Sequence, residues 1–284
     1  MSNEQDGDRR NVVASVVKAA ELLALFTRDE PVLRLGELSR RLGWNRHTTA
    51  RFVATLTQIG WLDRVDRGRD VFLRLGGGLL RYSPVVRASS TLREETRAAL
   101  RELTSQTSHT TYLMWKRGPF AVCLERISGE QIQVMHFDIG DAHPLIRGGG
   151  GPAILAAQGD DDQARILNSL GVSATERAAW YKRAKAIREQ GFNVSRSEVV
   201  DGISSLGVAL VSPTGTTVAA ISLATVSERL EGRAQADTVV VLQAAAAKLS
   251  GRLGVLGYLD DELGPAPMND VPASFVAAAT DEPE

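Results

Sequence analysis

The side chains with the clearest chemical potential lie between positions 45 and 51. Asn45, Arg46, His47 and Thr48 follow one another, and Arg51 comes one helical turn later. Arginine can donate two hydrogen bonds to guanine, and asparagine and threonine can bond to bases or phosphates. A helix that begins with such residues suits the DNA major groove, which receives the N-terminal end of a recognition helix. For each residue taken singly, a solvated surface helix is the plain alternative.

Three expected helices would position this group. Residues 12–26 and 35–42 show apolar residues at helical spacing, and Gly43 suits the end of the second helix because it tolerates positive φ. A third helix is expected from Asn45, a favourable N-cap residue, to Gly60. The inward-facing residues expected on the first and third helices are Val13, Val16, Val17, Ala20, Leu23, Ala24, Ala50, Val53, Leu56 and Ile59.

A charged hairpin is expected directly after the third helix. Trp61–Val65 and Val71–Leu75 are rich in strand-forming residues, and a turn-like segment separates them. Arg67 and Arg69 at its tip are placed to contact phosphates. Three helices followed by a hairpin is the order of a winged helix-turn-helix, which we assign to residues 10–76.

The charge distribution agrees with a polyanionic partner for this first part. Residues 9–75 contain thirteen Lys and Arg against seven Asp and Glu, although the whole chain has a net charge of -1. Residues 260–284 contain seven acidic residues and no basic one. A basic module joined to an acidic remainder indicates that only the first part meets nucleic acid. Chance clustering of surface charge is the alternative.

The rest of the chain predicts a hinge, a second domain and a tail. Residues 77–106 form a Gly-rich joint and a mostly polar linker helix, suited to bridging domains or to pairing with a second copy. Residues 107–258 form an α+β domain, and the acidic tail at 259–284 is expected to be disordered. The strands of the α+β domain are expected at Thr110–Lys116, Phe120–Ile127, Gln131–Phe137, Val208–Ser212 and Val218–Thr225, and its helices at about 161–170, 175–190 and 234–254.

A glycine run at Gly148–Gly151 is the second candidate for chemistry. It precedes Pro152, which is favourable in a first helical turn. A flexible loop that leads into a helix directs several backbone N–H groups outward, and this geometry suits a carboxylate or a phosphate. An ordinary turn is the alternative.

Several classes of protein are disfavoured. The four histidines lack metal-binding spacing, no phosphate-binding or dinucleotide fingerprint is present, and Cys123 is the single cysteine, so we expect no enzyme, metal or cofactor. His136 and His143 flank an expected strand end and are candidates for part of a site. No apolar stretch approaches the ~20 residues of a membrane helix, and the polar start lacks a signal-peptide core. The expected location is therefore the cytoplasm, away from the membrane.

The chain resembles the IclR family of transcription regulators. The resemblance rests on SVVKAAELLALF, LGELSRRLGWNRHTTARFVATLTQIGWL, GDAHPL with the glycine loop before PAILA, and GFNVSRSEVVDGISSLGVALVSPTGTTVAAISLA. It extends over about residues 12–255. The resemblance implies a GAF-like C-terminal domain that binds a small effector, often an organic or aromatic acid. It also implies homodimers, commonly paired into tetramers, on palindromic operators in double-stranded DNA.

The resemblance also implies positions for the effector site. The loop that supplies amides to the effector's carboxylate corresponds to Gly149 and Gly150, within the run that begins at Gly148. Positions that often carry an acidic residue, a cysteine and serines correspond to Ser195, Ser205, Ser222 and Ala224. The acidic residue and the cysteine are thus both serines here, and four glycines leave more backbone freedom than the family's usual loop.

Three further positions have open roles. Glu198 falls in an acidic stretch that the family carries before Gly202, where a solvated glutamate is the alternative. Met114, Leu124 and Met135 are candidates for the apolar wall of the pocket or for the core.

The resulting hypothesis is a sensor that controls DNA binding. Two winged helices would enter major grooves about one helical turn, ~34 Å, apart, and effector binding would move the linker helix and change that spacing. One alternative is a winged-helix DNA-binding protein whose second domain only oligomerises and binds no ligand. In another, the winged helix docks a protein.

Overall fold

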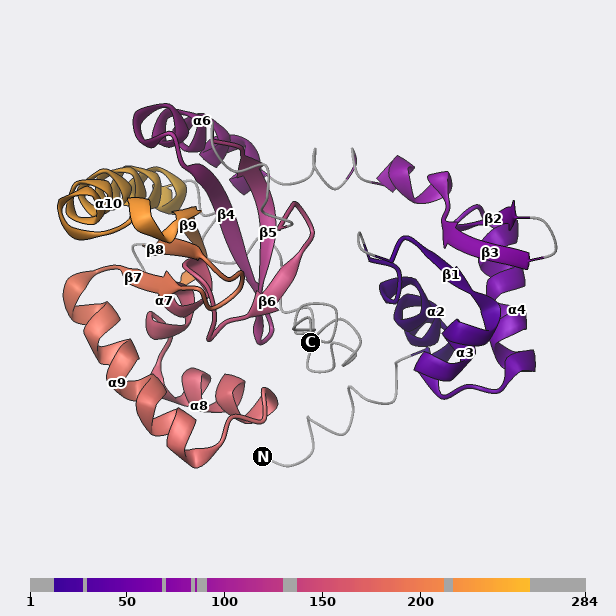
Figure 1. The fold of residues 1–284 in the computed structure, drawn as a ribbon. Coiled ribbons are helices and arrows are strands. Elements are labelled where there is room, and N and C mark those ends of the chain that lie inside the picture. The colour runs from indigo at the N-terminus through magenta and orange to yellow at the C-terminus, as the bar shows by residue number, and fades with distance from the viewer. Residues whose placement is uncertain are drawn as a thin grey trace. The chain divides into compact units, whose positions relative to one another are not determined.

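The computed structural model describes residues 13–27, 30–67, 70–82, 85, 91–129, 137–211 and 217–255. The chain divides into two compact units, and the boundary lies between Ser89 and Ser90. Figure 1 shows the elements in chain order, and each unit is described by itself below. Among the described residues, no helix combines the length and the apolar character needed to cross a membrane.

The first unit contains three helices and a small antiparallel sheet. The helices are α2 (Ala14–Ala24), α3 (Leu35–Leu42) and α4 (Arg46–Gln58). The strands β1 (Val32–Arg34), β2 (Leu62–Arg67) and β3 (Asp70–Leu75) form the sheet in the order β1-β3-β2. A short 3-10 helix, η2 (Gly77–Arg81), follows. This arrangement confirms the predicted winged helix-turn-helix and its hairpin.

The core of this unit differs in detail from the predicted stripes. Leu22 and Phe26 of the α2 segment are buried with Leu38, whereas Val16 is 66% exposed. Because α2 is apolar on most of its surface, the periodicity did not identify the inward face. On α4, Thr49, Val53 and Leu56 are buried, as predicted for the last two, but Ile59 is 52% exposed. Ile59 is the C-cap residue, where the chain leaves the helical path.

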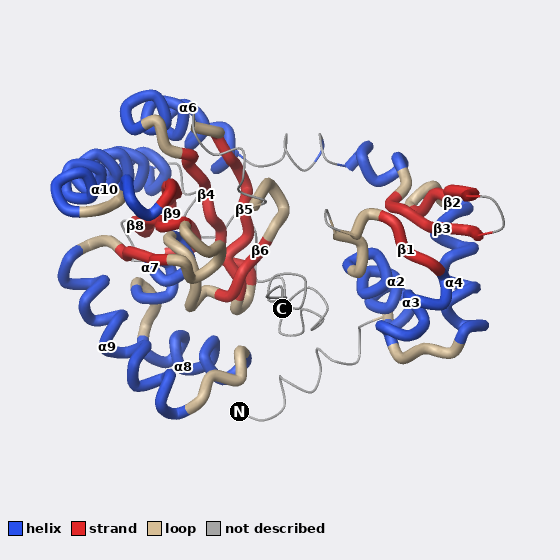
Figure 2. Tube along the Cα trace, in the orientation of Figure 1, coloured by secondary structure: helices blue, strands red, loops and turns tan. Residues whose placement is uncertain are grey.

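The second unit is built on one six-stranded antiparallel sheet in the order β6-β5-β4-β9-β8-β7 (Figure 2). The strands are β4 (Thr110–Arg117), β5 (Phe120–Ile127), β6 (Ala142–Pro144), β7 (Asn193–Arg196), β8 (Ile203–Val211) and β9 (Thr217–Val226). The sequence predicted β4, β5 and the β8–β9 hairpin but not the short strands β6 and β7. The predicted strand Gln131–Phe137 lies almost entirely outside the described residues.

Alternate residues of the central strands point to opposite faces of the sheet. Leu113 and Trp115 face one core with α6 (Thr91–Thr107) and α10 (Gly232–Val255), whereas Tyr112 and Met114 face the other. The second face carries α7 (Gly150–Ala156), α8 (Asp160–Ser169) and α9 (Ala174–Gln190). These two layers confirm an α+β domain.

The linker helix has a larger structural role than its polar composition indicated. The described helix α6 begins at Thr91, and its Leu100 and Leu103 are fully buried between the sheet and α10. Arg93 near its start pairs with Glu125 of β5 at 2.7 Å, and both side chains are buried. Three α6 residues therefore attach the helix to the second unit, which a bridging helix alone would not require.

Candidate functional site

The N-terminal end of α4 presents polar side chains to solvent. Asn45 is the N-cap residue, and its Oδ1 accepts the Thr48 N–H at 2.8 Å. The side chains of Arg46, His47 and Arg51 are exposed, and among the described residues they have no ion-pair or hydrogen-bond partner. Asn45 thus uses its carbonyl oxygen to cap the helix, and the three other side chains remain available to a ligand.

The turn before α4 fixes the direction of this end. Gly43 has φ of 64°, a left-handed conformation that glycine adopts without strain, and the Trp44 N–H donates to the Ser39 oxygen at 3.1 Å. The Trp44 ring then packs against Phe52, with 5.2 Å between ring centroids. Buried Thr49 donates its hydroxyl to the backbone carbonyl oxygen of Asn45 at 3.2 Å. These contacts fix the position of the polar end of α4.

Only some basic residues of the first unit are free to meet an anion. Arg41 on α3 contacts Glu30 at 2.6 Å and Glu37 at 2.7 Å. The guanidinium holds the pKa of Glu30 below its usual value, so the pair stays ionised at neutral pH. Arg41 is consequently neutralised within the unit, in contrast to Arg46 and Arg51.

The predicted wing residues fall at the edge of the described chain. Arg67 is the last residue of β2 and pairs in register with Asp70 of β3. Arg69 lies outside the described residues. The hairpin ladder nevertheless extends to Arg67, two residues beyond the predicted end of the strand.

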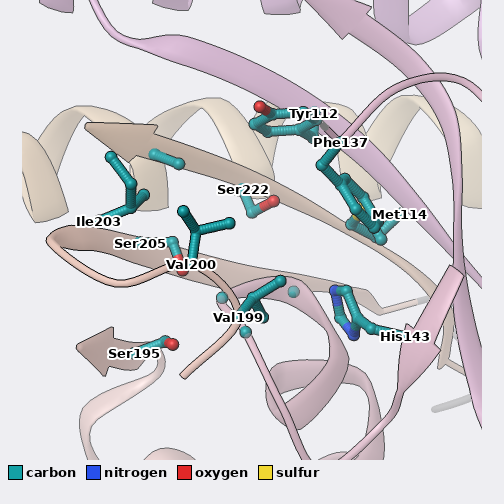
Figure 3. A pocket seen from close by; sticks show the side chains of 14 residues that line it. Tyr112, Met114, Phe137, His143, Ser195, Val199, Val200, Ile203, Ser205 and Ser222 are labelled. Atoms are coloured by element: carbon teal, nitrogen blue, oxygen red, sulfur yellow. The ribbon is translucent and has the colours of Figure 1, made fainter. Parts of the chain in front are cut away.

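A pocket opens in the second unit on the face of the sheet that carries α7 (Figure 3). Segments that are far apart in the sequence contribute to its wall. Among the lining residues are all six that the sequence predicted for the effector: Gly148, Gly149, Gly150, Ser195, Ser205 and Ser222. Met114 also lines the pocket, whereas Leu124 packs against the core on the other face and Met135 lies outside the described residues.

The glycine loop is closely packed, which differs from the expectation of a loose, mobile loop. Gly148, Gly149 and Gly150 are all buried. A Cβ on Gly149 would lie 2.9 Å from the Leu206 oxygen, and one on Gly150 would lie 2.8 Å from Cγ of Met114. Glycine is needed here because the loop backbone approaches the sheet, so the loop is pre-organised before any ligand binds.

Three polar side chains fix the position of this glycine loop. The Asn193 Nδ2 donates to the carbonyl oxygens of Gly148 and Gly149 at 2.8 and 2.9 Å. Glu198 accepts the Gly148 N–H at 3.1 Å, and Arg183 of α9 binds both Glu198 and the Asn193 Oδ1. Glu198 is therefore a partner of the loop and not a solvated glutamate.

This network also orients the amides of the loop. The N–H and C=O of a trans peptide point in opposite directions. Because Asn193 binds the carbonyls of Gly148 and Gly149, the following N–H groups, those of Gly149 and Gly150, turn away from Asn193. Neither N–H has a hydrogen-bond partner within the described parts of the chain. The helix that follows has only seven residues, so we attach the site to these two amides and not to the helix dipole.

Strand register brings the three serines together. Ser195 of β7 pairs with Ser205 of β8, and Ser205 in turn pairs with Ala224 of β9, two residues from Ser222. Residues two apart lie on the same face of a strand. No hydrogen-bond partner of these hydroxyls occurs in the described chain. The pocket therefore presents three hydroxyls, which can each donate or accept a hydrogen bond.

An aromatic wall completes the pocket. Tyr112 and Phe137 meet edge to face with 6.0 Å between ring centroids, and Phe137 lies 5.3 Å from the ring of His143. Burial raises the pKa of Tyr112 to about 12, so its phenol stays protonated. Across the described lining residues, no Asp, Glu, Lys or Arg side chain occurs. The sequence singled out His143 only as the neighbour of a strand end, and nothing local marked Tyr112 or Phe137.

Other reactive groups are scattered or inaccessible. Cys123 is fully buried on β5, and burial holds the pKa of its thiol well above the usual range. The described part of the chain contains no group of three His, Cys, Asp or Glu residues that could hold a metal ion. His136 lies outside the described residues.

The chain combines two features. The first is a winged helix-turn-helix with free polar side chains at the N-terminal end of α4, and the second is an α+β domain that contains a pocket. This combination defines the class of DNA-binding transcription regulators. Comparison with known families agrees over both units. Residues 15–66 match the IclR helix-turn-helix domain, and residues 86–251 match the C-terminal domain of the bacterial transcriptional regulator IclR. The chain therefore belongs to the IclR family; it is a DNA-binding transcription regulator and not an enzyme.

Individual relatives span nearly the whole chain. The HTH-type transcriptional regulator XynR of Escherichia coli is 26% identical over 250 residues, which are 86% of this chain and 98% of XynR. An IclR family transcriptional regulator from Brucella abortus shares the fold with a TM-score of 0.72 at 21% identity, over 89% of this chain and 96% of that one. An IclR homologue from Microbacterium hydrocarbonoxydans, solved in complex with 4-hydroxybenzoate, has a TM-score of 0.66 at 20% identity, over 85% and 99%.

Proposed function

We propose that this regulator binds a palindromic operator with an affinity that a small organic or aromatic acid controls. The observation that carries the proposal is the pocket, where a pre-organised glycine loop and three unpartnered serine hydroxyls converge beside aromatic rings. A homologue of the same fold binds 4-hydroxybenzoate, an aromatic acid.

The pocket chemistry favours an acid with an apolar body. The N–H groups of Gly149 and Gly150 and the serine hydroxyls supply donors for a carboxylate. Tyr112, Phe137, Val200 and Ile203 line the pocket and supply apolar surface for a ring. Because the described wall contributes no fixed positive charge, a multiply charged anion such as a phosphate fits the pocket less well than a monocarboxylate.

We propose that the polar end of α4 reads the operator. Arg46, His47, Thr48 and Arg51 would contact base edges or phosphates in the major groove, and Asn45 would contribute through its amide while it caps the helix. Arg67 and Arg69 would place the wing on the phosphate backbone. A palindromic site requires two winged helices, so the active species would be a homodimer or a dimer of dimers. The operator places this activity in the cytoplasm.

The DNA-binding part of the proposal is tested with Arg46→Ala and Arg51→Ala. Operator affinity of the full chain is measured by fluorescence anisotropy over a series of salt concentrations. Each variant should bind at least tenfold more weakly, and loss of a phosphate contact should reduce the slope of log affinity against log salt by about 0.9. Lys182→Ala removes one exposed charge from the second unit and should leave the affinity unchanged. Unchanged affinity in both arginine variants would refute the assignment.

The sensor part is tested with small acids, starting with 4-hydroxybenzoate. A ligand of the pocket should raise the melting temperature and change operator affinity, because it stabilises the state that it binds. Ser222→Ala removes one hydroxyl from the wall with little change in volume, and it should weaken the response to the acid while DNA binding persists. If no acid in a broad panel shifts either quantity, the second domain is a ligand-free oligomerisation domain.

A further inference from the structure

His143 is the ionisable side chain of the described pocket wall that lies against the glycine loop. A Cβ on Gly148 would stand 3.0 Å from the His143 Nε2 and 3.3 Å from a methyl group of Val199, so the imidazole and Val199 both flank Gly148. Figure 3 shows His143 and Val199 in the wall of the pocket. The ring is 6% exposed. Its position is fixed on the other side, where Nδ1 lies 3.1 Å from the Pro144 carbonyl oxygen.

The contact with Pro144 determines what His143 can offer a ligand. A carbonyl oxygen only accepts hydrogen bonds, so Nδ1 carries the proton in the neutral ring, and Nε2 is then an acceptor. Within the described chain, no hydrogen bond reaches Nε2. The pocket therefore holds one unsatisfied basic nitrogen beside the two loop amides.

The surroundings keep this nitrogen unprotonated when the pocket is empty. Burial lowers the pKa of His143 below its usual value, and the positive charge of Arg147 lowers it further. Glu198 is the nearest carboxylate on the loop after β7, and Arg183 of α9 neutralises it through a contact of 2.8 Å. Tyr112, Arg126, Asp138 and Asp141 are further ionisable groups on the segments around His143. Cys123 and Glu125 also lie on β5, which pairs with the strand of His143.

We propose that His143 recognises the acid group of the ligand by sharing one proton with it, so that binding takes up a proton from solution. This inference rests on the proposed acid-binding function of the pocket. The ligand enters as a carboxylate, one proton is drawn from the solvent, and it ends between Nε2 and a carboxylate oxygen. No other bond forms or breaks.

The reason is the cost of burying charge. A carboxylate beside unprotonated Nε2 would place two acceptors in contact, and its negative charge would be buried without a counter-charge. A single proton between the groups removes both penalties, and the loop amides and serines can still donate to the remaining lone pairs. A neutral amide ligand gains nothing from this proton, because its own N–H can donate to Nε2. His143 therefore makes the affinity for acids, and not the affinity for amides, depend on pH.

The sign of the pH dependence follows from linkage. Binding of the acid raises the pKa of His143, so the complex holds one more proton than the separate partners between the free and the bound pKa values. The apparent affinity for the acid is highest below the pKa of His143 in the free protein. It falls tenfold per pH unit from there up to the pKa of His143 in the complex. Binding of an amide analogue should not change across this window.

The test uses the full-length protein with sodium acetate, 4-hydroxybenzoate and 4-hydroxybenzamide, with sodium chloride at equal ionic strength as the reference. Nitrogen NMR of the imidazoles, assigned with His143→Gln, gives the pKa of His143 in each solution. Calorimetry at a pH between the free and the bound pKa values, in two buffers of different ionisation enthalpy, gives the number of protons taken up. We expect the pKa to rise by at least one unit with either acid, uptake close to one proton, and no uptake in His143→Gln. Ser222→Ala should bind more weakly but still take up the proton.

The outcomes separate this inference from the proposed function. If 4-hydroxybenzoate binds and alters operator affinity without proton uptake, the sensor stands and the role of His143 is refuted. If acetate raises the pKa of His143 but 4-hydroxybenzoate does not bind, recognition of the acid group stands and the aromatic class is wrong. If neither acid changes the pKa or the melting temperature, both proposals fail.

Discussion

The backbone of Gly207 lies directly against the carbonyl of Gly149. A Cβ at position 207 would stand 2.1 Å from the Gly149 oxygen, far inside any permitted contact. Gly207 lies on β8, between strands β7 and β9, and it pairs in register with Asn193 of β7 and Ser222 of β9. Gly207 thus determines how closely the glycine loop approaches Asn193 and the three serines of the pocket.

Gly207→Ala should therefore separate the loop from the sheet. Overpacking of a tight contact costs about 1–3 kcal/mol, and the displaced loop should also lose its response to acids. Chemical denaturation and thermal shift with 4-hydroxybenzoate measure the two effects. Gly251→Ala, at a helical position with open space around it, is the matched control and should not destabilise the protein. A Gly207→Ala protein with normal stability would contradict the close approach.

Substitutions of Asn45 should separate helix capping from DNA contact. Asn45→Ala removes the bond to the Thr48 N–H and should cost about 1 kcal/mol of stability in the first unit, with weaker operator binding. Asn45→Asp retains a capping oxygen but adds a negative charge near the phosphates, so it should fold normally and bind the operator more weakly. Denaturation and anisotropy distinguish the two. Equal operator affinity for the Asp variant and the natural chain would place Asn45 away from DNA.

The Arg93–Glu125 pair should be costly to break. Both partners are buried, and removal of one leaves the other charge uncompensated, at a cost of about 3–5 kcal/mol. Glu125→Ala should therefore lower the midpoint of urea unfolding of the second unit. Asp237→Ala breaks the exposed pair with Arg233 on α10 and should leave that midpoint unchanged. Equal effects of the two substitutions would show that burial of the first pair has no energetic weight.

Cys123 should be unreactive in the folded protein. Burial raises the pKa of its thiol, and the thiolate is the nucleophilic form, so very little reactive species exists at pH 8. Labelling with a thiol reagent should proceed only in denaturant, where the pKa returns to its ordinary value and the side chain is exposed. Rapid labelling without denaturant would show that the β5 region opens frequently.

Much of the local structure could be predicted from the sequence. Gly43 and Asn45 mark the turn and the start of α4, and the Trp61–Leu75 segment carries the pattern of a hairpin. These features depend on backbone preferences and hydrogen bonds between neighbours, so the residues themselves specify them. The same holds for the glycine loop, although its glycines serve close packing and not freedom of movement.

The tertiary structure alone decided how the pocket is assembled. Ser195, Ser205 and Ser222 meet because β7, β8 and β9 pair in one register, and a shift of one residue would turn each side chain to the other face. The network of Asn193, Glu198 and Arg183 joins segments that only the sheet brings together. The inward face of α2 was equally undetermined, because burial depends on what packs against a helix. Sequence patterns reflect interactions between residues that are close along the chain. The pocket instead depends on strand pairing and packing between segments that are far apart in the sequence.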